Sequence, residues 1–311
     1  MTTTEEAATI IKNGGVVAFP TETVYGIGAD ATSQSACLSI YKAKERPGHN
    51  PLIVHVNSIE QVKVYAEFNN NAQKLSKFWP GPLTMVLKKV QNSGLADCVT
   101  AGLDTVAIRI PAYTIAKNLI KQSECPIAAP SANKSGRLSP TSYDHVYDDF
   151  RDSIAIIKDK RSSTYGLEST IIDLSTDTPT ILRLGFITPE ILEESLGEKV
   201  KIASKLSKVK APGMLLKHYA PRTKLRLNAS TLLEGEIGLN FAGSSLVSEA
   251  SLNLSISGDL AEAAANLFNY LHQLDKYAVK HKIKSIAVAP IPNKSIGLAI
   301  NDRLSRAAEG S

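Results

Sequence analysis

The sequence has 311 residues, of which 43% are hydrophobic and 21% are charged. These proportions are typical of globular proteins and exclude a wholly disordered chain. No apolar run approaches the ~20 residues that a membrane span needs. The first residues do not predict a signal peptide, and three widely separated cysteines without paired spacing argue against a disulfide framework, so we expect a cytoplasmic protein that does not engage membranes.

The net charge of +5 is concentrated in one stretch of the chain. Residues 1–198 carry 19 basic and 22 acidic residues, and residues 227–311 carry 7 basic and 8 acidic residues. The stretch between them, residues 199–226, carries 9 basic residues and no acidic one. This stretch could contact a polyanion such as RNA or nucleotide phosphates, or it could be a solvated linker.

The first 198 residues predict strands and helices in irregular alternation. Short apolar runs predict strands at 16–19, 52–56, 83–87, 106–110, 127–129, 154–157, 170–174 and 180–184. Capping residues and apolar spacing predict helices at 4–12, capped by Thr4, and at 58–66, 70–78, 113–121 and 189–196. Because the alternation is not strict, we expect an α/β domain of α+β type with a twisted mixed sheet and covering helices.

A chain breaker at Ala211-Pro212-Gly213 lies in the basic stretch, which we interpret as an interdomain linker over residues 199–226. Beyond it, strands are predicted at 224–227, 237–241, 252–256 and 285–289. Helices are predicted from Ser257 or Asp259 to about residue 281 and over 298–308. This pattern is typical of a small Rossmann-like domain over residues 227–311, and the missing G-x-G-x-x-G motif argues against a dinucleotide there.

Polar residues gather directly after the first predicted strand, in Pro20-Thr21-Glu22-Thr23-Val24-Tyr25-Gly26. Ligand sites of α/β sheets commonly lie at such strand ends. Capping of the next element is the alternative. A second group is Lys42-Ala43-Lys44-Glu45-Arg46-Pro47, for which a solvated charge run is the alternative; Pro47 disfavours helix at Arg46. If this segment is extended, Lys44 and Arg46 point to one side and suit adjacent oxygens of a polyphosphate.

Three further charged or titratable residues interrupt apolar strands: His55, Arg109 and Arg183. His55 could be a satisfied core histidine. Arg109 needs an anion, which could be Asp104, Glu22 or the carboxylate of a ligand. Ser131 and Asn133 follow another strand, and Ser139 lies close behind them. Since these residues bind anions and include no convincing nucleophile or metal-ligand spacing, they suit adenylyl transfer, in which positioning and charge neutralisation dominate.

The ordered set of these motifs resembles the YrdC/Sua family of L-threonylcarbamoyladenylate synthases in its long, two-domain form. The resemblance rests on PTETVYG at 20–26, KERP at 44–47, NPLIVHV at 50–56, PGPLT at 80–84, VAIRIP at 106–111, PSAN at 130–133, SPT at 139–141, GLEST at 166–170, ILRLG at 181–185, PGM at 212–214, KHYAP at 217–221 and GLAINDRL at 297–304. Together these segments extend over nearly the whole chain, which is somewhat short for a long form.

The resemblance implies an enzyme, a nucleotidyltransferase that condenses L-threonine, bicarbonate and ATP to threonylcarbamoyl-AMP, pyrophosphate and water. A transferase complex would then modify tRNA beside the anticodon. The implied threonine-binding residues are Thr23, His55, Arg109, Ala129 and Ser169. The implied ATP-binding residues are Arg46, Asn50, Thr105, Ser131, Asn133, Ser139, Arg183 and Tyr219. Lys44, Arg46 and Arg109 would act by positioning and charge stabilisation, without an assigned general base.

Mg²⁺ is expected with ATP, held by the phosphates rather than by protein side chains. Tyr219 would lie on a linker that closes over the site as a lid. The alternatives are an RNA-binding module that uses the basic linker, a regulatory module that binds nucleotide without turnover, and a carbamoyltransferase domain. The net negative charge of residues 1–198 counts against RNA, and direct contact with tRNA is expected to be weak.

Overall fold

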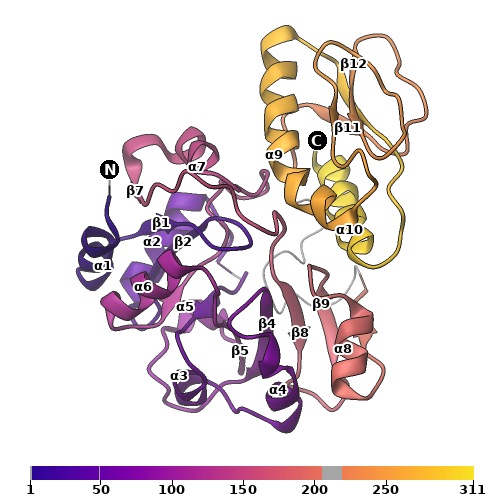
Figure 1. The fold of residues 1–311 in the computed structure, drawn as a ribbon. Helices are drawn as coiled ribbons and strands as arrows, with labels where there is room; N and C mark the ends of the chain where they lie inside the picture. Colours follow the sequence, from indigo (N-terminus) through magenta and orange to yellow (C-terminus); the bar gives the residue numbers. More distant parts are fainter. Residues whose placement is uncertain (1, 49, 205–218) are drawn as a thin grey trace.

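The computed structural model describes residues 2–48, 50–204 and 219–311, which form two α/β units (Figure 1). The first unit is built on a ten-stranded sheet with the strand order β10-β9-β8-β4-β5-β3-β6-β2-β1-β7. The second unit, in orange and yellow, is built on a four-stranded sheet with the order β11-β14-β12-β13. This layout confirms the predicted α/β fold with a mixed sheet and a second, smaller domain.

The first unit contains eight α-helices and ten strands among its described residues. The helices are α1 (Thr4–Lys12), α2 (Gln34–Lys44), α3 (Ile59–Tyr65), α4 (Asn70–Leu75), α5 (Asp97–Thr100), α6 (Thr114–Ser123), α7 (Tyr143–Phe150) and α8 (Pro189–Leu196). The strands are β1 (Val17–Phe19), β2 (Gly26–Asp30), β3 (Ile53–His55), β4 (Leu83–Lys88), β5 (Thr105–Arg109), β6 (Ile127–Ala128), β7 (Ala155–Ile156), β8 (Thr170–Asp173), β9 (Thr180–Arg183) and β10 (Lys201–Ile202).

Local capping explains where several helices begin. Thr3, and not the predicted Thr4, caps α1, because its side chain accepts from the backbone N–H of Glu6 while the Glu6 carboxylate accepts from Thr3 N–H. Ser58 caps α3 as predicted. The helices α2, α5 and α7 and the strands β2 and β10 were not predicted. The amphipathic pattern of α2 is weak, and β2 contains two glycines.

The sheet of the first unit is mixed, and its central parallel pair positions two polar residues. Strands β3 and β5 are parallel, and His55 and Arg109 are register partners at their carboxyl ends. Strand β4 pairs antiparallel with β5 and parallel with β8. The amino ends of β4 and β8 therefore lie at the same edge of the sheet as the carboxyl ends of β3 and β5.

The second unit is a small parallel α/β domain, as predicted. Its strands are β11 (Lys224–Arg226), β12 (Glu236–Asn240), β13 (Leu252–Asn253) and β14 (Ser285–Val288), and all of the sheet's pairings are parallel. The helices are α9 (Leu260–His281), which Asp259 caps, and α10 (Ile296–Gly310). In Figure 1, α9 and α10 both reach the boundary with the first unit.

The described ends of the predicted linker are strands in the two sheets. Strand β10 pairs with β9 at the edge of the first sheet, and β11 pairs with β14 in the second. The predicted breaker at Pro212-Gly213 and the basic residues from 205 to 218 lie outside the described residues. Of the other basic residues in the stretch, Lys199 pairs with Glu193 at 2.8 Å, and Arg226 pairs with Glu236 at 2.5 Å.

The two units are in intimate contact. Gly166, with a φ of +65°, lies so close to α9 that a Cβ there would be 2.5 Å from the carbonyl oxygens of Ala264 and Ala265. Buried side chains of the first unit, Val24 and Leu138 among them, join the apolar core of the second. One face of the first unit is thus packed against the second unit.

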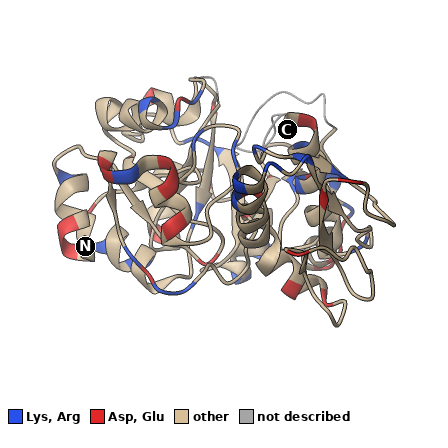
Figure 2. Cartoon of the chain, turned by 90° about the horizontal axis from the view of Figure 1, so that it is seen from above, with Lys and Arg blue, Asp and Glu red and all other residues tan. Residues whose placement is uncertain are grey.

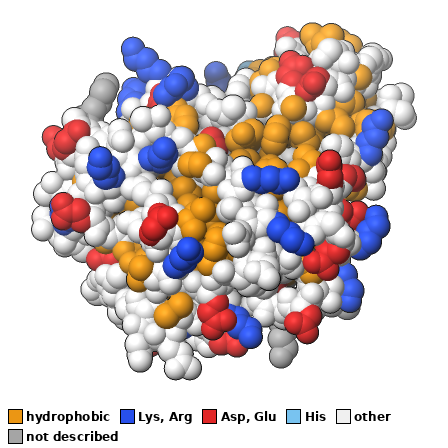
Figure 3. All heavy atoms as spheres, turned by 60° about the horizontal axis from the view of Figure 1, so that its bottom comes forward, with side chains coloured by type: hydrophobic (Ala, Val, Ile, Leu, Met, Phe, Trp, Pro, Cys, Tyr) orange, Lys and Arg blue, Asp and Glu red, His pale blue; other side chains and the backbone are white. Residues whose placement is uncertain are grey.

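The surface carries both signs of charge on both units, as Figure 2 shows. The face in Figure 3 has apolar side chains across its middle with basic and acidic side chains around them. The large exposed apolar side chains come from separate elements, such as Leu38 on α2, Val64 on α3 and Ile191 on α8. No helix among the described residues is long and apolar enough to span a bilayer.

Candidate active site

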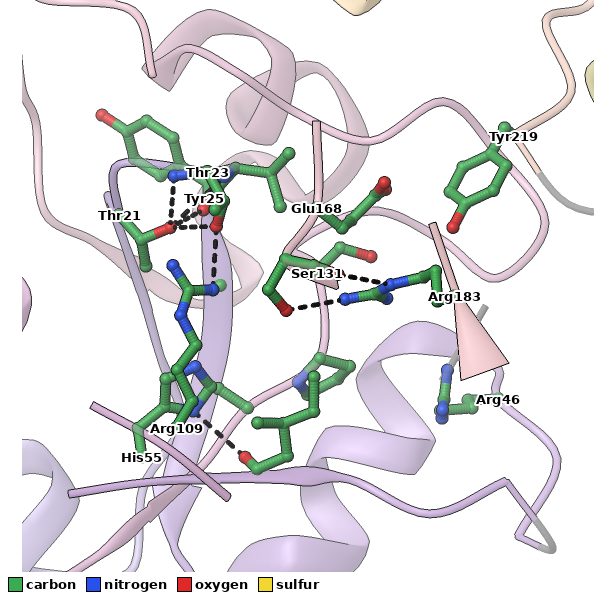
Figure 4. Close-up of a pocket in the computed structure, with 16 residues that line it drawn as sticks. Thr21, Thr23, Tyr25, Arg46, His55, Arg109, Ser131, Glu168, Arg183 and Tyr219 are labelled. Carbon is green, nitrogen blue, oxygen red and sulfur yellow. Dashed lines mark hydrogen bonds between the residues drawn. The ribbon is translucent and has the colours of Figure 1, made fainter. Parts of the chain in front are cut away.

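A small cavity lies at the carboxyl ends of β3 and β5, next to the boundary between the units (Figure 4). Its volume of about 40 Å³ has room for a few water molecules. The lining residues come from both halves of the first unit and from Tyr219; they are Thr21, Thr23, Val24, Tyr25, Gly26, Arg46, Ile53, His55, Arg109, Ala129, Pro130, Ser131, Glu168, Ser169, Arg183 and Tyr219. All five predicted threonine-binding residues are in this set. Of the predicted ATP-binding residues it contains Arg46, Ser131, Arg183 and Tyr219.

The loop between β1 and β2 forms one wall and is ordered by its own threonines. The Thr21 hydroxyl donates to the Val24 carbonyl at 2.6 Å and accepts from the Thr23 backbone N–H at 3.1 Å. The two hydroxyl groups of Thr21 and Thr23 lie 2.8 Å apart. Backbone bonds from Tyr25 to Pro140 and from Ala132 to Tyr25 then fix the loop to residues 130–140.

Arg109 is held by this loop through an ion pair with Glu22. The guanidinium donates to the Glu22 carboxylate at 2.5 Å, to the Thr23 hydroxyl at 2.9 Å and to the Gly81 carbonyl at 3.1 Å. Of the anions considered from the sequence, Glu22 is the structural partner. Each terminal nitrogen of the guanidinium carries a second N–H group, so Arg109 can still address a ligand carboxylate.

His55 lies beside Arg109 and is buried. Its Nδ1 is 3.1 Å from the Ile53 carbonyl oxygen, and its ring meets that of Phe19 edge to face. Burial, and then the neighbouring Arg109 charge, lower the pKa of His55 to about 3. The ring is therefore neutral at pH 7 and can donate or accept one hydrogen bond in the cavity.

Ser169 and Arg183 form the opposite wall. Arg183 donates to the Ser169 carbonyl and to its hydroxyl, both at 3.0 Å, and the same hydroxyl lies 2.7 Å from that of Thr84. These bonds fix Ser169, which lines the cavity together with Arg183. Ser169 directly precedes β8, and Arg183 ends the antiparallel neighbour β9. A residue predicted to bind threonine and a residue predicted to bind ATP are therefore in direct contact.

The segment around Lys44 and Arg46 differs from the prediction. Lys44 is the last residue of α2 and Glu45 follows it with a positive φ, so the two cations are not on one side of an extended segment. The Lys44 ammonium is buried and donates to the carbonyls of Ser131 and Asn133, and it does not line the cavity. The prediction of an extended pair was wrong because the helix continues up to two residues before Arg46.

Arg46 does line the cavity. It donates to the carbonyls of Asn50 and Pro51, and among the described residues it has no ion-pair partner. Burial lowers the pKa of Arg46 to about 10, so its charge persists at pH 7. A buried guanidinium of this kind is suited to bind an anionic group of a ligand.

The other predicted nucleotide residues lie behind the lining rather than in it. Thr105 begins β5, on the same side of the strand as Arg109. Asn50 and Asn133 are buried, and within the described residues their side-chain Oδ1 atoms accept no hydrogen bond. Ser139 is fully buried and donates its hydroxyl to Glu168.

Glu168 is a cavity residue that the sequence reasoning did not single out. Its carboxylate accepts from Ser139 and, at 2.9 Å, from Arg303 of the second unit. Glu168 belongs to the GLEST motif at residues 166–170, but its partner Arg303 lies 135 residues away in the chain. Tyr219, which is 1% exposed, closes the cavity on the same side and has a φ of +65°.

The charges of the cavity wall favour a ligand with more than one anionic group. Arg109 is neutralised by Glu22, and Glu168 is neutralised by Arg303. Arg46 and Arg183 add positive charge on the Tyr219 side. The arrangement can therefore hold a small polar acid beside His55 and Arg109, and a polyanion beside Arg46 and Arg183.

Two family models together match nearly the whole chain. A model of the Sua5, YciO and YrdC proteins, described as "Telomere recombination", matches residues 9–185. A model described as "Threonylcarbamoyl-AMP synthase, C-terminal domain" matches residues 187–309.

Curated proteins and solved structures agree with these models. The chain is 42% identical to a threonylcarbamoyl-AMP synthase of Pyrococcus abyssi, over 97% of this chain and 93% of that protein. It is 38% identical to one of Bacillus subtilis, over 98% and 92%. A crystal structure of P. abyssi Sua5 complexed with L-threonine has a TM-score of 0.89 at 39% identity and covers 99% of this chain and 94% of that one.

Proposed function

Because the chain belongs to the Sua5/YrdC family of threonylcarbamoyl-AMP synthases, we propose that its cavity binds L-threonine and ATP side by side and joins them through bicarbonate. The observation that carries this proposal is the meeting of Thr23, His55, Arg109, Ala129 and Ser169 on one cavity. The reaction consumes L-threonine, bicarbonate and ATP and yields threonylcarbamoyl-AMP, pyrophosphate and water.

Threonine is held on the side of β3 and β5. Its carboxylate takes the second N–H groups of the Arg109 guanidinium, which Glu22 and Thr23 hold in a fixed plane. Neutral His55 and the hydroxyl groups of Thr23 and Ser169 are available to the amine and side-chain hydroxyl of the substrate. The threonine complex of the P. abyssi relative, at 39% identity, supports this assignment.

ATP is held on the side of Tyr219. Arg46 and Arg183 address its phosphates, and Ser131 adds a further polar contact. Asn50, Thr105, Asn133 and Ser139 form the supporting layer of this proposed nucleotide site. The cavity of about 40 Å³ is smaller than ATP, and Tyr219 is proposed to move when the nucleotide enters.

The chemistry then depends mainly on positioning. The threonine amine captures bicarbonate as a carbamate with loss of water, and a carbamate oxygen attacks the α-phosphate of ATP, from which pyrophosphate leaves. Fixed guanidinium groups stabilise the charge that develops on the phosphate oxygens. Tyr219 and the second unit exclude water from the mixed anhydride that forms.

Mg²⁺ is proposed as a companion of ATP. When bound, it neutralises phosphate charge and orients the phosphates. Glu168 is the carboxylate in the cavity wall, and it is already engaged with Ser139 and Arg303. The donor set therefore fits a metal ion that is held by the phosphates.

The product is proposed to pass to an enzyme complex that transfers the threonylcarbamoyl group to an adenosine beside the anticodon of tRNA. Contact between this chain and tRNA is proposed to be weak. Both signs of charge are interspersed on the surface (Figure 2), and the described basic residues Lys199 and Arg226 are already paired with carboxylates.

The test is pyrophosphate release with ATP, Mg²⁺, L-threonine and bicarbonate, each omitted in turn. We expect release only when threonine and bicarbonate are both present. ATP binding without pyrophosphate would instead favour a regulatory nucleotide-binding module. Tight RNA binding that weakens steeply with salt and needs no threonine would favour the RNA-binding alternative.

A further inference from the structure

An arginine of the last helix is buried beside the cavity although it belongs to the second unit. Arg303 on α10 is 1% exposed, and its Nε donates to Glu168 at 2.9 Å. Its terminal nitrogens donate to the Leu184 carbonyl at 2.7 Å and to Asp302 at 2.8 Å. A charged side chain is buried this deeply only when its partners compensate the loss of water.

The main partner of Arg303 is a residue of the cavity wall. One Glu168 oxygen accepts from Arg303, and the other accepts from the Ser139 hydroxyl. Burial alone would raise the pKa of Glu168, but the Arg303 and Arg183 charges hold it below its ordinary value. Arg303 therefore keeps a carboxylate ionised beside the proposed phosphate site, and that carboxylate fixes Ser139.

Arg303 also supports Tyr219. Its guanidinium lies 5.2 Å from the centre of the Tyr219 ring, and the ring of Phe268 on α9 lies 5.5 Å from the same ring. The two helices of the second unit thus both contact the Tyr219 ring. The contact of α9 with Gly166, two residues before Glu168, fixes the loop that carries the carboxylate.

We propose that Arg303 is a positioning residue through which the second unit sets the ATP side of the active site. It acts on the nucleotide through Glu168, which holds Ser139, and through its contact with the Tyr219 ring. Removing its charge takes away the direct ion-pair partner of Glu168 beside the proposed phosphate site and leaves the more distant Arg183 charge, so ATP binding weakens while threonine binding is little affected. This inference rests on the proposed function for the identity of the nucleotide.

The test is a set of variants in the full chain: R303M, R303K, E168Q and the double variant E168Q/R303M. R303M keeps the length of the side chain and removes the charge. We expect it to raise the KM for ATP by roughly threefold to thirtyfold with a much smaller change in the KM for threonine. R303K should recover part of the loss, because it restores the charge without the planar guanidinium.

The double variant separates positioning from mere structural support. E168Q removes the carboxylate that Arg303 compensates, so E168Q/R303M should bind ATP better than R303M. The KM for ATP of R303M should also fall as the pH is lowered, because Glu168 without its partner takes up a proton more readily. The matched control is R306M on the same helix, whose guanidinium pairs with Asp302 at 3.0 Å and does not contact Glu168 in the described residues.

An R303M protein with the ATP KM of R306M overturns the proposal. So does a double variant that binds ATP no better than R303M. If urea unfolding shows that R303M does not fold, the KM for ATP is compared between R303K and E168Q/R303K instead, with E168Q as the reference. If the parent protein releases no pyrophosphate, the proposed function fails, and calorimetric binding of ATP to the same variants still decides the role of Arg303.

Discussion

At the scale of single residues, the buried ion pair of Arg109 and Glu22 combines two tasks. The pair lets a charged side chain lie inside the first unit, and it presents the remaining N–H groups of the guanidinium to the cavity. Removing one partner of such a pair leaves an uncompensated buried charge. A truncation at this site would therefore confuse loss of binding with loss of folding, and a conservative change is more informative.

The variant R109K tests the assignment of Arg109. It keeps the charge opposite Glu22 but loses the planar fork, so we expect the KM for threonine to rise by about tenfold to a hundredfold. The expected change in the KM for ATP is small. Pyrophosphate release at varied threonine concentration measures this effect.

The control is E22Q, which breaks the same ion pair from the other side. It should lower the free energy of unfolding by about 3 kcal/mol or more, and because it leaves the Arg109 guanidinium in place, the KM for threonine should rise less than in R109K. An R109K enzyme with an unchanged threonine KM would contradict the assignment.

At this scale the sequence was informative where an unusual residue stood in an apolar strand. His55, Arg109 and Arg183 were singled out for this reason, and all three line the cavity. Lys44 was misplaced, because its environment is set by the carbonyls of Ser131 and Asn133, which only the folded chain brings close.

At the scale of elements, two helices from different units meet through a pair of histidines. His145 on α7 and His272 on α9 stack with ring centres 3.8 Å apart, and His272 Nε2 lies 3.2 Å from the Ser139 carbonyl oxygen. Burial, the other ring and then Lys276 lower the pKa of His145 to about 2, and burial lowers the pKa of His272 although Asp148, Asp149 and Asp275 oppose it.

This stack predicts a loss of stability in mild acid. The unfolded chain takes up protons on these rings as the pH falls through about 6.5, whereas the folded chain does not, so stability is lost below that pH. His55, whose pKa burial also lowers, adds to this loss of stability in acid. We expect the urea midpoint to fall between pH 7.5 and pH 5.5.

The variant H145F keeps a stacked ring that cannot titrate. Its urea midpoint should depend less on pH than that of the parent protein. At pH 5.5, the acid-induced loss in the free energy of unfolding should be smaller in H145F by on the order of 1 kcal/mol. An equal pH dependence in both proteins would show that the stack does not carry the effect.

The sequence predicted most elements of the fold but not all of their consequences. Apolar runs with clear boundaries, such as residues 83–87 and 237–241, became β4 and β12. The helix α2 was missed, although it determines where Lys44 points, because its buried face combines small residues and a lysine with Ile40 and Tyr41. Its weak amphipathic pattern is compensated by tertiary packing, which no local pattern reveals.

At the scale of the whole molecule, the interface between the units completes the candidate site. Glu168 and Arg303 are 135 residues apart, and neither has a sequence pattern that predicts the other. The sequence indicated two domains, but it could not indicate that one provides the counter-ion of the other's cavity. Such pairing depends on the packing of α9 and α10 against the loop at residues 166–169.

The variant G166A tests the importance of this packing. A methyl group there would lie 2.5 Å from two carbonyl oxygens of α9, so the units must separate locally or the loop must shift. We expect a loss of several kcal/mol in stability, about 3 or more, together with a raised KM for ATP. Urea unfolding and pyrophosphate release measure the two effects.

The matched control is G197A at the end of α8. Gly197 also has a positive φ, of +76°, but a methyl group there would meet nothing within 4 Å. We expect G197A to lower the free energy of unfolding by only the backbone penalty of roughly 1 kcal/mol and to leave the KM for ATP unchanged. Equal effects of the two substitutions would contradict a special role for the contact of Gly166 with α9.

The strand order of the second sheet has a consequence for protein synthesis. Strand β14 lies between β11 and β12 although it is made last, so this sheet cannot close until residue 288 has left the ribosome. Arg303 follows later still. At about 5–20 residues per second, a nascent chain that has completed the first sheet at Ile202 carries Glu168 without its counter-ion for roughly 5–20 s. The proposed nucleotide side of the site is thus complete only when translation of the chain is nearly finished.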